Sequence, residues 1–92
     1  MRIALDYDGT YTANPYAWER GLGTFMDFAE GWELVCVTMR YPSESIEIKW
    51  MGVEVPVYYT SRKAKKPYME SIGKSVDIWI DDSPHWVLQD SV

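Results

Sequence analysis

Short, largely apolar segments alternate along this chain with segments whose apolar residues recur at helical spacing. The apolar segments span residues 2–5, 33–38, 53–59 and 75–80, and each has the length of a strand. Because strands that alternate with helices through short links form parallel sheets, we predict an α/β fold. The expected architecture is a Rossmann-like three-layer αβα sandwich around a short sheet of about four parallel strands. Pro56 indicates that the third strand lies at an edge of the sheet.

Proline and glycine mark the ends of three predicted helices. The first has Asn14 as its N-cap, Pro15 as its first residue and Gly31 as its stop signal. The second is predicted from Pro42 to about Met51, closed by Gly52, and the third from Pro67 to Gly73. The apolar positions of the first helix are Trp18, Leu22, Phe25, Met26 and Ala29.

Length and composition restrict the class of protein. Residues 1–92 are expected to form one domain, near the lower size limit for a chain with a single hydrophobic core. Neither a membrane-spanning stretch nor a signal peptide is recognisable, so we expect a soluble, cytoplasmic protein. Cys36 lies in an apolar run and is expected to be a buried, reduced thiol. The 5 Trp and 7 Tyr suit a subunit interface as well as a core, so a homo-oligomer is a reasonable expectation.

The net charge of −5 argues against a general nucleic-acid binder, because such proteins carry clustered Lys and Arg. Residues 62–66, with the sequence Arg-Lys-Ala-Lys-Lys, form a local exception. A basic run of this kind is usually a solvated surface, but it leaves open an interaction with nucleotides or nucleic-acid ends.

Polar residues follow the predicted strands at the point where each strand ends. Asp6 and Asp8 come after the first strand, Thr38 ends the second, lysines follow the third, and Asp81-Asp82 follows the fourth. In a parallel sheet the carboxyl ends of the strands share one edge, and ligands bind there. We therefore expect all of these groups in one site.

The residue types at this edge suit phosphoryl transfer. Asp6 is placed to attack phosphorus and form an aspartyl-phosphate, while Asp8 protonates the leaving oxygen and later deprotonates the attacking water. Gly9 lets the backbone turn close to a ligand. Several carboxylates at one site need a hard divalent cation, and Mg²⁺ with its oxygen ligands supplies that charge. A lysine and Thr38 would hold the phosphoryl oxygens.

Each of these features also has a purely structural explanation. The Asp-x-Asp-Gly-Thr pattern occurs in ordinary turns and in Ca²⁺-binding loops, and a threonine that ends a strand is usually a β-former. A pair of Asp residues after a strand often caps a turn or a helix. The catalytic hypothesis depends on the occurrence of all of these features in order, each at the end of its own strand.

In these residues the chain resembles the haloacid dehalogenase (HAD)-like superfamily of hydrolases. The first motif of the superfamily, Asp-x-Asp-Gly-Thr after a strand, matches residues 6–10. The second, a Thr or Ser that ends the next strand, matches Thr38, and the fourth, a paired Asp after apolar residues, matches Asp81-Asp82. The resemblance covers residues 2–84 and implies an Mg²⁺-dependent phosphohydrolase, a phosphomonoesterase that acts through an aspartyl-phosphate.

The resemblance implies a role for each matched residue. Asp6 would be the nucleophile and a metal ligand, and Asp8 would be the acid/base, with its backbone carbonyl on the metal. Asp81 would be the third protein ligand of the metal, and Asp82 would support the site through a water or a hydrogen bond. The phosphoryl group would be bound by Gly9, Thr38, Met39 and Lys65.

The lysine of the third motif has several candidates. Lys63, Lys65, Lys66 and Lys74 all precede the fourth strand. In the superfamily this lysine commonly lies at or just before a helix start, which Pro67 marks here, so Lys65 is preferred and Lys66 comes second. Lys74 directly precedes the strand and is expected at the opposite edge of the sheet.

The segments in which larger superfamily members carry a substrate-selecting cap are short here, at residues 11–14 and 60–64. We therefore expect a capless site that accepts a phosphorylated small molecule, a nucleotide or a nucleic-acid end. The alternative is a domain of the same fold that serves as a non-catalytic binding or assembly module. His85 and Trp86 are expected to cover the sheet, and the candidate rim residues are Tyr7, Tyr11, Trp18, Arg40, Tyr41 and Tyr59.

Overall fold

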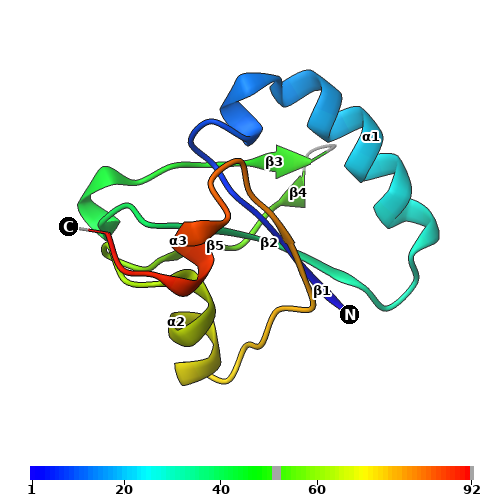
Figure 1. Ribbon diagram of the computed structural model, residues 1–92. Helices are drawn as coiled ribbons and strands as arrows, with labels where there is room; N and C mark the ends of the chain where they lie inside the picture. Colours follow the sequence, from blue (N-terminus) through cyan, green and yellow to red (C-terminus); the bar gives the residue numbers. More distant parts are fainter. Residues whose placement is uncertain (51–52, 92) are drawn as a thin grey trace.

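Four parallel strands form the central sheet of the computed structural model, which describes residues 1–50 and 53–91. The strands lie in the order β5 (Val57–Tyr59), β2 (Glu33–Thr38), β1 (Arg2–Leu5) and β6 (Ile78–Ile80) (Figure 1). The predicted α/β class and its parallel sheet are confirmed, and the third strand does lie at an edge. β1 pairs with β2 on one side and with β6 on the other, so the strand order reverses at β1. Ligands bind beside such a reversal, at the C-terminal ends of the strands.

The two faces of the sheet carry separate apolar clusters, because successive strand residues point to opposite faces. Leu5 belongs to one cluster and its neighbour Ala4 to the other. Side chains of α1 (Pro15–Phe28) pack on the Leu5 side, and Met69 of α2 (Lys65–Ser71) is fully buried on the Ala4 side. This packing fixes β1, and with it the loop that follows, from both faces.

The first helix begins where the sequence predicts and ends at Phe28, three residues before the predicted stop signal Gly31. The N-cap Asn14 accepts a hydrogen bond at Oδ1 from the backbone N–H of Ala17 at 3.1 Å, and Pro15 is the first helical residue. Gly31 follows the helix with a φ of +80°, a backbone conformation that glycine adopts without strain. Before α1, a 3₁₀ turn, η1 (Tyr11–Ala13), links the helix to the loop after β1.

The predicted second helix is wrong. Only a single 3₁₀ turn, η2 (Pro42–Glu44), forms there, and Lys49 then enters β3 (Lys49–Trp50), which pairs with β4 (Val53–Glu54) in an antiparallel ribbon. Apolar and charged residues alternate with a period of two over residues 46–49, and Ile48 is buried in the core at 1% exposure. Met51 and Gly52, the predicted end of this helix, lie outside the described residues.

Three further boundaries differ from the prediction. The strand predicted over 53–59 is interrupted at Pro56, which has no N–H to donate to a ladder, so β4 and β5 belong to different sheets. The helix predicted from Pro67 begins two residues earlier, at Lys65, and the strand predicted over 75–80 is shorter, as β6. The earlier start of α2 matters most, because it makes Lys65 the first helical residue.

A short helix, α3 (His85–Leu88), follows β6 and contacts α2. The sequence predicted only that His85 and Trp86 cover the sheet. Val87 is the buried member of the helix, whereas His85 is exposed and Trp86 is half-buried. In Figure 1 the segment after α3 returns past the start of α2.

Two other expectations concern the state of Cys36 and the presence of membrane-spanning segments. Cys36 is fully buried, as predicted, and burial raises the pKa of its thiol to about 12. Within the described residues, every helix is too short or too polar to cross a lipid bilayer.

Candidate active site

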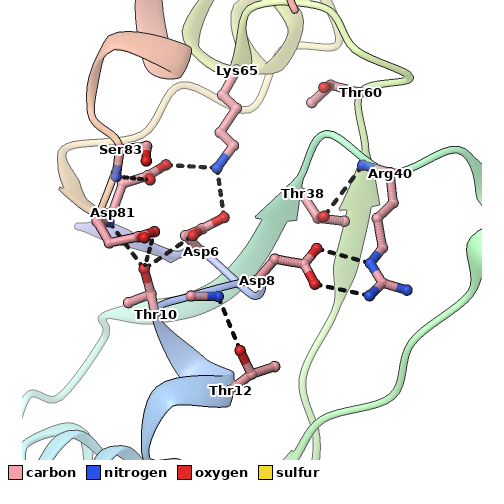
Figure 2. Close-up of polar contacts among 12 residues, drawn as sticks. Asp6, Asp8, Thr10, Thr12, Thr38, Arg40, Thr60, Lys65, Asp81 and Ser83 are labelled. Carbon is pink, nitrogen blue, oxygen red and sulfur yellow. Dashed lines mark hydrogen bonds and ion pairs between the residues drawn. The ribbon is translucent and has the colours of Figure 1, made fainter.

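A pocket of about 220 Å³ opens at the C-terminal ends of β1, β2 and β6. Its walls include most of the side chains that the sequence assigns to a site, and Figure 2 shows how the acidic residues and Lys65 lie within it. The lining residues are Asp6, Asp8, Thr38, Met39, Arg40, Arg62, Lys65, Asp81, Asp82, Ser83, Trp86 and Ser91.

Asp6 lies at the reversal of strand order. Its backbone N–H donates to the carbonyl of Ile80 at 2.9 Å, which continues the pairing of β1 with β6 by one residue. The side chain is only 8% exposed, and its two oxygens have different partners. Oδ1 accepts from Lys65 Nζ at 2.7 Å, and Oδ2 accepts from the Thr10 hydroxyl at 3.0 Å.

Lys65 is the lysine that the fold brings to Asp6. Its side chain is 3% exposed, and Nζ contacts Asp6 Oδ1 at 2.7 Å and Asp81 Oδ2 at 2.6 Å. Burial alone would lower the pKa of Lys65, but the two carboxylates outweigh it and raise the pKa above its ordinary value. Lys63 and Lys66 are exposed, and neither they nor Lys74 line the pocket.

Thr10 connects the loop after β1 with the loop after β6. Its hydroxyl lies 3.0 Å from Asp6 Oδ2 and 2.9 Å from Asp82 Oδ1, and it accepts a hydrogen bond from the backbone N–H of Asp82 at 3.0 Å. The sequence places Thr10 in a motif but does not reveal this contact. The pKa of Asp82 is lowered, first by the hydrogen bond from Thr10.

Gly9 allows this close approach of the two loops. It has a φ of +83°, and a Cβ at this position would lie 2.5 Å from Asp82 Oδ2. Any other residue would therefore be strained and would push Asp82 out of place. The predicted need for glycine here has a steric reason within the site, whereas Gly9, predicted to bind the phosphoryl group, is not among the residues that line the pocket.

The three aspartates lack a full counter-charge. Asp6, Asp81 and Asp82 offer oxygens that all lie within 4.8 Å of one another. Lys65 balances one of their three negative charges, and among the described residues no other cation forms an ion pair with them, which leaves two charges uncompensated there. Burial raises the pKa of Asp6 to about 6, against the opposing effect of Lys65 and with the support of the charge on Asp81. A divalent cation would supply the missing charge.

The donor set also fits Mg²⁺ in its chemistry. The three side chains offer carboxylate oxygens, which hard cations prefer. Octahedral Mg²⁺ holds oxygens at about 2.1 Å, so that opposite ligands lie roughly 4 Å apart. Asp81 Oδ1 is oriented by the backbone N–H of Ser83 at 2.9 Å, as ligating carboxylates commonly are. Asp6, Asp81 and Asp82 are the side chains that would hold the ion; the side chain of Asp8 is not part of this cluster.

Mg²⁺ is expected to raise the melting temperature of the protein, because it binds the folded state. At a concentration about one hundred times its Kd, it should raise the free energy of unfolding by about 2.7 kcal/mol. Replacing Asp81 with Ala should reduce this shift, whereas the exposed Asp27 of α1, outside the cluster, serves as the matched control. Thermal unfolding with and without Mg²⁺ measures both. An equal shift in the parent and Asp81→Ala would remove Asp81 from the ligands.

Asp8 is held by Arg40, an arrangement that the sequence does not predict. Arg40 donates from Nε and Nη2 to the two carboxylate oxygens at 2.9 and 2.8 Å (Figure 2). Its guanidinium lies 5.3 Å from the centre of the Tyr7 ring. The hydrogen bonds from Arg40 lower the pKa of Asp8, although burial opposes them. Asp8 is therefore an ionised carboxylate in this arrangement, and it is half exposed at the mouth of the pocket.

Three donors in the pocket wall have no acceptor among the described residues. Thr38 is 1% exposed, and its hydroxyl accepts from Arg40 N at 3.3 Å but donates to no described group. The backbone N–H of Met39 also has no described acceptor. Lys65 has three N–H groups and uses two of them on Asp6 and Asp81. Unsatisfied buried donors are costly, and oxygens of a bound anion would satisfy them.

Most of the predicted rim residues do not line this pocket. Tyr7, Tyr11 and Trp18 pack against the cluster around Leu5, and Tyr59 bonds the backbone of Ile46 through its hydroxyl. Tyr41 is exposed outside the pocket wall, so Arg40 is the single member of the predicted set found in it among the described residues.

The sequence missed four wall residues: Arg62, Ser83, Trp86 and Ser91. Arg62 belongs to the basic run noted above, and Trp86 was assigned to cover the sheet. Ser91 reaches the pocket because its backbone N–H donates to the carbonyl of Arg62 at 2.8 Å. Asp90 beside it accepts from the N–H of Ala64 at 2.6 Å. These long-range contacts leave no local signal in the sequence.

Comparisons of the chain with protein-family models, with curated proteins and with solved structures gave no significant match. The chemistry of the chain is therefore inferred from the geometry and residue types of this pocket.

Proposed function

We propose that this protein is an Mg²⁺-dependent phosphohydrolase that cleaves phosphomonoesters through an aspartyl-phosphate on Asp6. The proposal includes membership of the HAD-like superfamily, as a capless member whose helices and sheet form a reduced three-layer αβα sandwich. One observation carries it: Asp6 lies beside Lys65 and the acidic pair Asp81-Asp82, in a pocket whose wall also holds buried donors. Within the described part of the chain, these carboxylates lack two positive charges and these donors lack acceptors. Carboxylates that need a divalent cation and donors that need an anion are the two halves of a phosphate site.

In the first step an oxygen of Asp6 attacks phosphorus, the bond from phosphorus to the leaving oxygen breaks, and Asp8 gives that oxygen a proton. In the second step Asp8 takes a proton from water, whose oxygen attacks the phosphorus and releases inorganic phosphate and free Asp6. Thr38 and Lys65 bind the phosphoryl oxygens throughout. When bound, Mg²⁺ neutralises charge on the aspartates and on the phosphoryl group.

Asp8 can act as an acid only after its ion pair with Arg40 has opened, because the pair keeps its carboxylate ionised. The phosphate of an arriving substrate competes with Asp8 for the Arg40 guanidinium, since arginine binds phosphate and carboxylate with the same forked geometry. We infer that substrate binding weakens the pair and frees Asp8 to take up a proton.

Asp8→Asn is expected to impair the hydrolysis of alkyl phosphates far more than that of aryl phosphates, by about 100-fold or more in the ratio of kcat/KM values. This ratio reports the step in which the leaving oxygen departs, whereas hydrolysis of the aspartyl-phosphate is common to both substrates. A nitrophenolate leaves without a proton, whereas an alkoxide does not. Steady-state kinetics on p-nitrophenyl phosphate and on an alkyl phosphate measure this ratio. Equal losses on both substrates would show that Asp8 is not the acid.

A phosphatase screen with Mg²⁺ tests the proposal as a whole, with sugar phosphates, mononucleotides, a 3′-phosphorylated oligonucleotide and an aryl phosphate as substrates. Release of phosphate from at least one of them, lost on chelation of Mg²⁺, is the expected result. A panel that yields no Mg²⁺-dependent release contradicts the proposal.

The second candidate is a non-catalytic module that binds a phosphate group. One observation favours it: Asp8 is already occupied by two hydrogen bonds from Arg40. Tight binding of phosphorylated ligands without turnover in the same screen would select this candidate over the enzyme.

A further inference from the structure

Arg62 is held in the pocket wall by an unusual backbone. Ser61 and Arg62 both have positive φ values, of 54° and 69°, a region that residues other than glycine seldom adopt. The backbone N–H of Arg62 donates to the carbonyl of Met39 at 2.9 Å, and its carbonyl accepts from Ser91 at 2.8 Å. Strained conformations of this kind persist where the surrounding structure over-determines them, and they cluster at functional sites.

The guanidinium of Arg62 makes weaker contacts with carboxylates than the other cations of the pocket do. Lys65 makes two short contacts to carboxylates, and Arg40 makes two to Asp8. Among the described residues, the carboxylate that pairs with Arg62 is Glu44, at 3.7 Å, which is too long for a hydrogen bond. The side chain is 38% exposed and lies over the Tyr41 ring at 5.4 Å. It therefore has donors available for a ligand.

The residues proposed to bind the cleaved phosphoryl group are more deeply buried than Arg62. Lys65, Thr38 and the backbone of Met39 line the wall around Asp6, and the proposed Mg²⁺ adds two positive charges there. Arg62 is a further cation in the same wall, in a protein of net charge −5.

We propose that Arg62 binds a second phosphate group of the substrate, so that the preferred substrate is a phosphomonoester with another phosphate close to the one that is cleaved. This inference rests on the proposed function of the same pocket. The second phosphate has two sources, a small bisphosphate or the phosphodiester next to a phosphorylated oligonucleotide end. Arginine suits both, because its planar fork binds phosphate oxygens in pairs. Trp86, half-buried in the same wall, offers a ring for a neighbouring base.

The test compares a nucleoside 3′,5′-bisphosphate with the matching 3′-monophosphate. The loss of a hydrogen-bonded charge pair corresponds to about tenfold or more in affinity. Arg62→Gln should therefore lower the ratio of kcat/KM for bisphosphate over monophosphate by about tenfold. Arg62→Lys should restore part of the ratio. A 3′-phosphorylated dinucleotide, compared in the same way, separates the phosphodiester from the free bisphosphate.

Arg20→Gln is the matched control. Arg20 also lies over a tyrosine ring, Tyr16 at 5.4 Å, but on α1 and outside the pocket wall. The Arg20→Gln variant should leave the ratio of kcat/KM for bisphosphate over monophosphate unchanged. An unchanged ratio in Arg62→Gln, or an equal fall in Arg20→Gln, would overturn the inference.

Equilibrium binding separates this inference from the proposed function. The bisphosphate and the monophosphate are titrated calorimetrically into two variants, Asp6→Asn and the double variant that also carries Arg62→Gln. This binding measurement requires no turnover. A tenfold loss of affinity confined to the bisphosphate supports the subsite even if no substrate is hydrolysed. Turnover without any such loss keeps the proposed function and contradicts the subsite.

Discussion

Asp6→Asn is expected to reduce Mg²⁺-dependent phosphate release by more than about 1,000-fold, the scale on which the loss of a covalent nucleophile acts. The amide keeps the shape of the side chain but cannot attack phosphorus. Phosphate release from an aryl phosphate measures the effect. Activity close to that of the parent protein would mean that Asp6 is not the nucleophile.

The fold of this variant can be checked independently, because Asp6 carries its own pH signature. Its pKa rises from 3.8 to about 6 on folding, so between these values the folded chain holds a proton that the unfolded chain has released. Stability therefore falls as the pH rises through this window, and the penalty is complete above about pH 6. In metal-free buffer at pH 7.5, Asp6→Asn should melt at or above the melting temperature of the parent protein. Between pH 4 and pH 6, its melting temperature should fall less than that of the parent.

Lys65→Met is expected to destabilise the metal-free protein by about 3–5 kcal/mol at neutral pH, as is typical when one partner of a buried ion pair is removed. Lys65 is 3% exposed, and its loss leaves Asp6 and Asp81 without the ammonium that lies between them. Urea unfolding measures the change. Mg²⁺ should recover part of the loss, because it supplies positive charge to the same carboxylates.

Lys66→Met provides the matched control for Lys65→Met. Lys66 is the next residue in α2 and is exposed, so its replacement should stay within about 0.5 kcal/mol of the parent. Equal effects of the two variants would show that the contacts of Lys65 do not stabilise the fold. They would also reopen the choice between the two lysines that the sequence left unresolved.

The strand ends were the part of the site that the sequence could predict. Asp6, Thr38 and Asp81 each follow an apolar run, and a parallel sheet has to bring such positions to one edge. Lys65 was harder to choose, because Lys63, Lys65 and Lys66 are separated only by where α2 begins. That helix starts two residues before Pro67, where Asp90 receives the N–H of Ala64 at 2.6 Å.

The remaining features depend on contacts between distant residues. The pairing of Asp8 with Arg40 spans 32 positions and depends on the directions of two side chains. The strained backbone of Arg62 depends on Met39 and on Ser91, which no local pattern connects with it. The ribbon of β3 and β4, in contrast, does have a local signal in the sequence. The period-two alternation over residues 46–49 indicates a strand, although Pro42 led to the prediction of a helix.

The most direct test of the account is the chemical state of Asp6 during turnover. The protein is mixed with Mg²⁺ and an aryl phosphate, quenched in acid, and digested for mass spectrometry of the peptide that contains residues 6–10. We predict a phosphoryl group on Asp6 in the parent protein and none in Asp6→Asn. Mg²⁺-dependent phosphate release that continues in Asp6→Asn, with no phosphoryl group on Asp6 in the parent, would contradict the account.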